Sequence, residues 1–132
     1  MTRTVYVNGE WLAEDKATVS IFDRGFLMAD GVYEVTSVLD GKLIDFGGHC
    51  ARLRRSLSEL DMPSPATDEA LLAIHRELLE RNNVVDGMIY LQVTRGKAER
   101  DFAFPASVTP TMSLSSAVPR RTRSSGWLSQ SA

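Results

Sequence analysis

A chain of 132 residues, 43% of them hydrophobic and 24% charged, has the composition of one soluble globular domain with a single core. Its formal net charge of −2 argues against binding to nucleic acid or to an anionic membrane, and no apolar run is long enough to span a bilayer. Cys50 is the only cysteine, which excludes an intramolecular disulfide, and the N-terminus does not resemble a signal peptide; both features predict a cytoplasmic protein.

The N-terminal part of the chain predicts short strands joined by turns. Asn8-Gly9 separates two short apolar runs, and this dipeptide favours a two-residue hairpin because both central positions of a type I′ turn need positive φ. The run at 18–22, rich in β-branched residues, predicts a further short strand. Loops with glycine and aspartate then flank a small apolar segment at 26–28.

A longer strand is predicted at 32–39, where β-branched residues are frequent. The two-residue period of a strand places Tyr33 and Val35 on one face. The opposite face carries Val32, Glu34, Thr36 and Val38. Asp40-Gly41 predicts a second hairpin that leads into a short strand at 42–44.

After these strands, the spacing of the apolar residues changes from the two-residue period of a strand to that of a helix, which predicts two helices. Cys50 and the leucines at 53, 57 and 60 recur at helical spacing, and Pro63 ends this helix. Either Thr67 or Asp68 can cap a second helix, which ends at Asn82-Asn83, where asparagine tolerates the left-handed conformation.

Strands predicted at 88–94 and from residue 108 to 112 complete the pattern. Helices grouped between strands that pair through hairpins predict an α+β fold, an antiparallel sheet with two helices.

The residues that could carry chemistry have ordinary structural interpretations when they are taken singly. His49 and Arg52 lie at i and i+3 on one helix side, where a partly buried histidine and a solvated arginine are common. Tyr33 is by default a core aromatic, and Arg100 a surface charge in a polar loop. No cluster has the spacing of metal ligands, and the sequence contains neither a phosphate-binding glycine loop nor a nucleophile elbow.

The order and spacing of four motifs change this interpretation. They are Asp-Arg-Gly at 23–25, Asp-Gly-Val-Tyr-Glu-Val at 30–35, His-Cys-Ala-Arg-Leu at 49–53 and Tyr-Leu-Gln-Val-Thr-Arg-Gly at 90–96. Together they resemble the N-terminal domain of the fold-type-IV, pyridoxal-phosphate-dependent aminotransferases, closest to the D-amino acid aminotransferases. Branched-chain aminotransferases and aminodeoxychorismate lyases, the related branches, usually differ in the second motif.

The resemblance implies roles for five residues. Arg52 matches the arginine that binds the phosphate of pyridoxal 5′-phosphate, and His49 a residue that supports it. Tyr33 and Arg100 match residues that hold the substrate carboxylate, the arginine coming from the other subunit of a dimer, and Val35 lines the same pocket. The family transfers an amino group between an amino acid and a 2-oxo acid, so these are the expected substrates and a homo-oligomer the expected assembly.

Three features depart from the family. Phe102 stands where the best-known carboxylate site has a histidine, so a hydrogen-bond donor is replaced by an apolar ring. The lysines at 16, 42 and 97 do not match the lysine that holds the cofactor. Residues 113–132 contain seven serines, three arginines and no acid, which predicts a domain at 1–112 followed by an atypical tail, disordered or frame-shifted.

These departures predict a truncated chain that is inactive by itself, and they leave two other functions open. One is a non-catalytic interaction protein that keeps the dimer-forming domain of the family. The other is a small module that binds phosphorylated compounds through Tyr33, Arg52 and Arg100.

Overall fold

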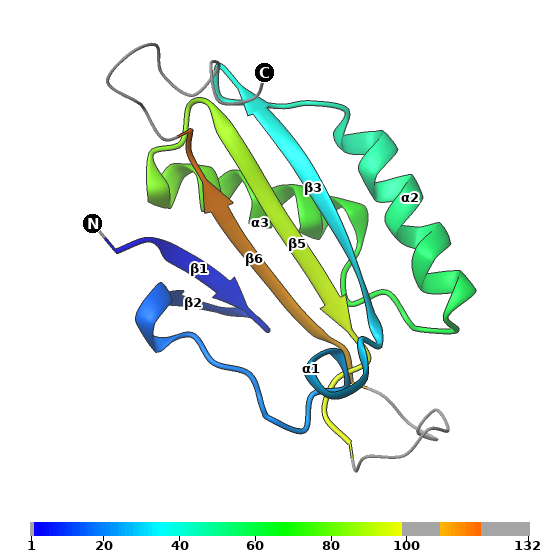
Figure 1. Cartoon of the computed structure of the whole chain (residues 1–132). Helices are drawn as coiled ribbons and strands as arrows, with labels where there is room; N and C mark the ends of the chain where they lie inside the picture. The colour runs from blue at the N-terminus through cyan, green and yellow to red at the C-terminus, as the bar shows by residue number, and fades with distance from the viewer. Residues whose placement is uncertain (1, 99–108, 120–132) are drawn as a thin grey trace.

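The computed structural model describes residues 2–98 and 109–119, which form one six-stranded antiparallel sheet with helices packed on it (Figure 1). The strand order across the sheet is β2-β1-β6-β5-β3-β4. The strands are β1 (Thr4–Val7), β2 (Glu10–Ala13), β3 (Gly31–Leu39), β4 (Lys42–Leu43), β5 (Gly87–Thr94) and β6 (Thr111–Ala117). The helices are η1 (Glu14–Lys16, a 3-10 turn), α1 (Arg24–Met28), α2 (Phe46–Glu59) and α3 (Asp68–Asn82). The predicted α+β class with an antiparallel sheet and two long helices is confirmed.

Both predicted hairpins form at residues with positive φ. Asn8 and Gly9 have φ of 49° and 91°, and Asp40 and Gly41 have φ of 51° and 72°. These values match the two central positions of a type I′ turn, whose twist follows that of the flanking strands. The two turns therefore join β1 to β2 and β3 to β4 as antiparallel pairs.

The second long helix begins and ends where its sequence predicts. The Thr67 hydroxyl accepts a hydrogen bond from the backbone N–H of Ala70 at 3.1 Å, so Thr67 and not Asp68 is the cap. Asn83 closes the helix with a φ of 53°.

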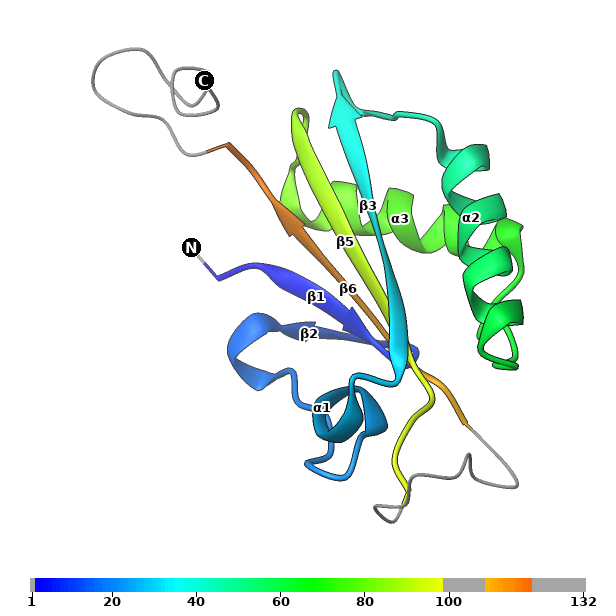
Figure 2. The ribbon, with the colours of Figure 1, turned by 45° about the vertical axis from the view of Figure 1, so that its right-hand side comes forward.

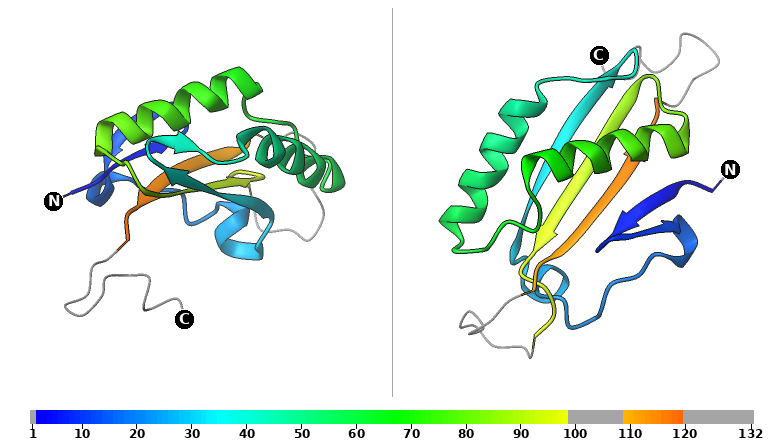
Figure 3. Two further views of the ribbon diagram at one scale, coloured as in Figure 1. Left: turned by 90° about the horizontal axis from the view of Figure 1, so that it is seen from above. Right: turned by 180° about the vertical axis from the view of Figure 1, so that it is seen from behind.

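The core lies between the two long helices and one face of the sheet. Its most deeply buried side chains are Val38, Leu53, Leu57, Leu71, Leu78, Ile89, Val93 and Leu114. Figure 3 shows α2 and α3 over the same side of the sheet, with α1 on the other side. In Figure 2, turned by 45°, the two long helices again lie together beside the sheet, away from α1.

The sheet therefore has a covered face and an open face. In β3, Glu34, Thr36 and Val38 are buried under the helices, as the strand period predicts. Tyr33 and Leu39 point to the open face and are 63% and 58% exposed. Apolar side chains thus remain on the surface of a sheet that a helix layer covers on one side only.

Residues 18–22 form no strand. Instead the chain turns, since the backbone N–H of Asp23 donates to the Ser20 carbonyl at 3.0 Å and that of Phe22 to the Ser20 hydroxyl at 3.0 Å. No strand pairs with this segment in the described part of the chain, and its β-branched residues stay exposed, Ile21 at 68%. The apolar segment at 26–28 lies in α1, whose N-cap Asp23 accepts from Gly25.

The boundary predicted at 112 falls inside a strand, so the start of the predicted tail belongs to the sheet. β6 runs to Ala117 between β1 and β5, and Met112, Leu114 and Ser116 alternate toward the core. Because Ser116 is polar but occupies a buried position of β6, the alternation of apolar and polar residues is not evident from the sequence. The rest of the tail, 120–132, lies outside the described residues. Within the described residues no helix has the length and apolar character to cross a membrane.

Candidate functional site

Arg52, His49 and Glu34 form a hydrogen-bonded group between α2 and β3, here called the Glu34 cluster. Arg52 donates from Nε to Glu34 Oε2 at 2.9 Å and from Nη2 to Glu34 Oε1 at 2.8 Å. The Nδ1 atom of His49 lies 2.7 Å from Glu34 Oε1. One buried carboxylate therefore binds both of the α2 residues that the sequence singled out.

The geometry of α2 and β3 explains why His49 and Arg52 both contact Glu34. The three-residue spacing in α2 puts His49 and Arg52 on one helix side, and the strand period turns Glu34 toward the helices. The Glu34 side chain is 6% exposed and that of Arg52 is 56% exposed. The cluster is therefore anchored at a buried acid and opens to solvent at the guanidinium.

The charges of the cluster reinforce one another. Burial alone would raise the pKa of Glu34, but the hydrogen bonds from Arg52 and His49 hold it below its ordinary value, so the group is a carboxylate at neutral pH. The bond to Glu34 raises the pKa of Arg52, and Asp45 and Tyr33 add smaller effects of the same sign. Glu34 therefore dominates the electrostatics of Arg52.

Hydrogen-bond chemistry assigns the His49 proton. An ionised carboxylate only accepts, so Nδ1 of His49 carries the hydrogen and donates it to Glu34. The 3.3 Å approach of Arg52 Nη2 to the same nitrogen then joins two donors and is a contact.

Tyr33 and Val35 lie on the open face beside a second tyrosine. The rings of Tyr33 and Tyr90 stack with centroids 5.7 Å apart and planes 16° apart. Val35 pairs with Tyr90 across β3 and β5, and Tyr33 pairs with Gln92. Gln92 also lines a cavity of about 260 Å³ between this face and α1. The two residues predicted to contact substrate thus share a semi-exposed aromatic surface.

The structure brings together His49 with Arg52 and Tyr33 with Val35, the pairs expected from the motifs. Arg100 and Phe102 lie outside the described residues. The sequence motifs contain Glu34 and Tyr90 but do not reveal their contacts with Arg52 and Tyr33. A signal for Glu34 was available, because a carboxylate on the buried face of an apolar strand needs a charged partner.

The first motif, Asp-Arg-Gly, contributes to a buried ion network. Asp30 Oδ2 accepts from Arg24 Nε at 2.7 Å and from Arg95 Nε at 2.8 Å, and both arginine side chains are 2% exposed. Arg95 also donates to the Leu60 carbonyl at 2.7 Å. The network ties the ends of β3 and β5 to α1 and to the C-terminal end of α2, so this motif has a structural role.

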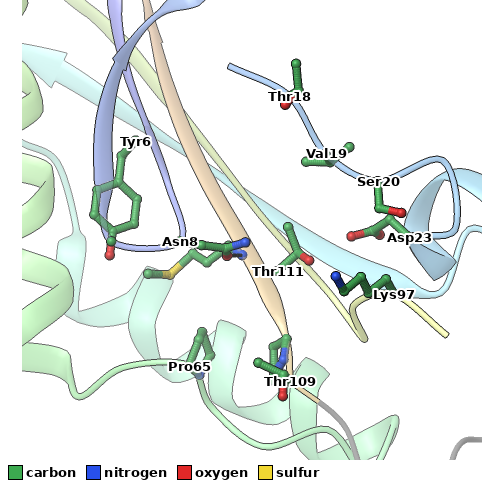
Figure 4. Close-up of a pocket in the computed structure, with 13 residues that line it drawn as sticks. Tyr6, Asn8, Thr18, Val19, Ser20, Asp23, Pro65, Lys97, Thr109 and Thr111 are labelled. Atoms are coloured by element: carbon green, nitrogen blue, oxygen red, sulfur yellow. Dashed lines mark hydrogen bonds between the residues drawn. The ribbon is translucent and has the colours of Figure 1, made fainter. Parts of the chain in front are cut away.

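A cavity of about 730 Å³ lies elsewhere, beside the β1–β2 turn (Figure 4). Asn8, Thr18, Ser20, Lys97 and Thr111 are among its lining residues, and none of the Glu34 cluster is. Lys97 and Asp23 are the charged residues that line it, and their opposite charges offset each other. The described residues include no group of three histidine, cysteine, aspartate or glutamate side chains that could hold a metal ion.

The fold and these motifs agree with the comparisons to known proteins. The sequence profile of the family described as Amino-transferase class IV matches residues 31–130, and the chain belongs to this family. D-alanine aminotransferases are similar in sequence. That of Staphylococcus epidermidis is 45% identical over 101 residues, or 76% of this chain and 36% of the relative. That of Bacillus licheniformis is 39% identical over 106 residues, 80% of this chain and 38% of the relative. The chain thus spans little more than a third of the relatives it matches.

Solved structures of the family share the fold. The branched-chain amino acid aminotransferase of Escherichia coli superposes with a TM-score of 0.82 at 17% identity, over 89% of this chain and 40% of that one. The 4-amino-4-deoxychorismate lyase of Pseudomonas aeruginosa gives 0.69 at 28% identity, over 89% of this chain and 41% of that one. Structural neighbours thus come from several branches of the family.

Proposed function

We propose that this chain forms one wall of the active site of a D-amino acid aminotransferase, which transfers an amino group from a D-amino acid to a 2-oxo acid with pyridoxal 5′-phosphate. The observation that carries the proposal is the Glu34 cluster. It presents a half-exposed arginine side chain that is already bound to Glu34, the residue next to the exposed Tyr33 in β3. Sequence identity of 39–45% to D-alanine aminotransferases favours this branch over the branched-chain and lyase branches.

The residues present fit the phosphate end of the cofactor. Glu34 occupies the edge of the guanidinium formed by Nε and Nη2, and no described residue accepts a hydrogen bond from Nη1. The edge formed by Nη1 and Nη2 is therefore available to a phosphate, whose oxygens match the planar fork of donors. When bound, the cofactor supplies the electron sink for amino-group transfer.

The side chains of the open face would hold the substrate. The Tyr33 hydroxyl can donate a hydrogen bond to a carboxylate, while the Tyr90 ring and Val35 exclude water from the adjoining surface. Arg100 remains the proposed second carboxylate ligand, contributed by another subunit of a homo-oligomer. Phe102 would make that part of the site more apolar than a histidine would.

The chain alone is expected to be inactive. The lysines of the described residues lie in η1, at the start of β4 and just after β5, and Lys97, the last of these, lines the separate cavity beside the β1–β2 turn. Lys16, Lys42 and Lys97 are all exposed amines, so borohydride treatment of the chain with pyridoxal 5′-phosphate should label none of them in preference to the others. Attachment at a defined lysine by mass spectrometry would contradict this expectation.

Binding of pyridoxal 5′-phosphate, followed by tryptophan fluorescence, tests the phosphate contact. We expect the Arg52→Ala variant to bind at least about tenfold more weakly, because a charge-assisted bidentate contact is lost. Arg54→Ala is the matched control, since Arg54 lies on the same helix, is 53% exposed and pairs with Asp68. Equal effects of the two substitutions would mean that Arg52 acts only through net charge and would refute the assignment.

The exposed apolar residues of the open face support a second function, that of an interaction domain without catalysis. Tyr33, Leu39, Met88 and Tyr90 are each at least 39% exposed there. Stable co-purification with a full-length class IV aminotransferase, without any effect of Arg52→Ala on cofactor binding, would favour this function.

A further inference from the structure

The Glu34 cluster poses an electrostatic conflict if Arg52 binds an anion. The Glu34 carboxylate lies 2.8–2.9 Å from two guanidinium nitrogens and carries a full negative charge. It therefore neutralises Arg52 and repels any second anion at the opposite edge of the guanidinium. By charge alone, Glu34 weakens the anion affinity of this arginine.

The geometry of the Glu34 cluster, in contrast, favours anion binding by Arg52. An arginine side chain that is 56% exposed has many rotamers, and fixing them on binding opposes affinity. Two hydrogen bonds, from Nε and Nη2, fix the guanidinium plane before any ligand arrives. They leave the edge formed by Nη1 and Nη2 facing away from the carboxylate.

His49 fixes Glu34 in turn. Its Nδ1–H donates to Oε1, the oxygen that also accepts from Arg52 Nη2, so this oxygen receives two hydrogen bonds. The His49 side chain is 18% exposed, which limits competition from water for this bond. The other charged or titratable groups that act on Arg52 are Asp45, which precedes α2, and Tyr33, on β3.

We infer that Glu34 is a positioning residue, which raises the affinity of Arg52 for a phosphate group by orienting the guanidinium, with His49 holding the carboxylate in place. The inference rests on the proposed function, because it takes Arg52 to be the phosphate ligand. Orientation outweighs repulsion here, so removing the negative charge weakens anion binding. A simple charge argument predicts the reverse sign.

Titration of the whole chain with inorganic phosphate, followed by NMR chemical shifts, tests this sign. We expect Glu34→Gln, of equal size and uncharged, to weaken phosphate binding about tenfold. In the Arg52→Ala background the same substitution should change nothing, because Glu34 acts through Arg52. Unchanged or tighter binding by the single Glu34→Gln variant would overturn the inference and leave the phosphate contact of Arg52 intact.

The arms of the experiment separate this inference from the proposed function. Phosphate binding that does not change with Arg52→Ala would overturn the proposed phosphate contact and, with it, the inference. A purely structural role, in which the ion pair only docks α2 on β3, predicts a lower melting temperature for Glu34→Gln and unchanged phosphate affinity. That result would also overturn the inference.

A measurement without any variant guards against the case in which Glu34→Gln does not fold. In the unmodified chain, the ¹H–¹⁵N signal of Arg52 Nε–H should be visible at neutral pH before phosphate is added, because its hydrogen is bound to Glu34. Phosphate should leave this signal in place. A signal that appears only with phosphate would show that the ligand orders the side chain, and the inference would be wrong.

Discussion

Replacement of Asp30 by asparagine should destabilise the fold more than any surface substitution. The carboxylate accepts hydrogen bonds at 2.7 Å from Arg24 and 2.8 Å from Arg95, and both guanidinium groups are buried. Breaking a buried ion pair from one side typically lowers the free energy of unfolding by about 3–5 kcal/mol. The amide oxygen of asparagine still accepts one hydrogen bond, so we expect a loss of about 3 kcal/mol, or about 10 °C in Tm.

Urea unfolding measured by circular dichroism gives this quantity, and Asp68→Asn is the control. Asp68 forms an ion pair with Arg54, but the two side chains are 47% and 53% exposed. Its replacement should lower the free energy of unfolding by no more than about 1 kcal/mol. If Asp30→Asn were no more destabilising than Asp68→Asn, the buried network would not stabilise the fold and the reasoning would be refuted.

The same network predicts part of the acid sensitivity. Burial acts to raise the pKa of Asp30, but the hydrogen bonds from Arg95 and Arg24 hold it below the ordinary value of 3.8. A group whose pKa is depressed in the folded state contributes stability above its unfolded pKa, and this contribution is lost as the pH falls through the folded value. Asp30→Asn should therefore flatten the decrease of stability below about pH 4.

Burial lowers the pKa of His75 below 6.5, so the free energy of unfolding should decrease below about pH 6.5, and His75→Gln should reduce that slope in pH-dependent urea titrations. Gly96→Ala should destabilise by at least about 2 kcal/mol in the same assay, because φ is +95° and an added Cβ would lie 2.1 Å from a backbone oxygen. Gly9→Ala, at a φ of +91° with open space, should cost only about 1 kcal/mol, and equal effects would argue against the steric reason. The chain should self-associate in light scattering, and replacing Tyr33 and Tyr90 by serine should reduce this; an unmodified chain that is monomeric at all concentrations would contradict the role of the open face.

Local sequence predicted the fold where short-range chemistry dominates. The Asn8-Gly9 turn and the cap at Thr67, one of the two predicted candidates, follow from residues close together in the chain, as do the helical stripes, of which only Leu60 lies beyond its helix. The segment at 18–22 did not, because β-branched residues form a strand only where a partner strand is available. The alternation in β6 was missed because Ser116 is buried among apolar residues.

For the candidate site, too, the sequence predicted the arrangement of residues within each element but not the contacts between elements. The spacing in α2 brought His49 and Arg52 to one side, and the strand period separated Tyr33 from Glu34. The contact between α2 and β3 that makes Glu34 their common partner depends on tertiary packing. No spacing within one element encodes that contact.

The sequence by itself determined which residues turn, cap and alternate, and it carried the motifs that placed the chain among the class IV aminotransferases. Those features depend on backbone conformation and on side chains a few positions apart, which the chain specifies locally. Only the tertiary structure decided that Arg24, Asp30 and Arg95 share a buried network and that Arg52 binds Glu34. Ion pairs between distant residues form only where packing of the helices on the sheet removes water and brings each buried charge within reach of its partners.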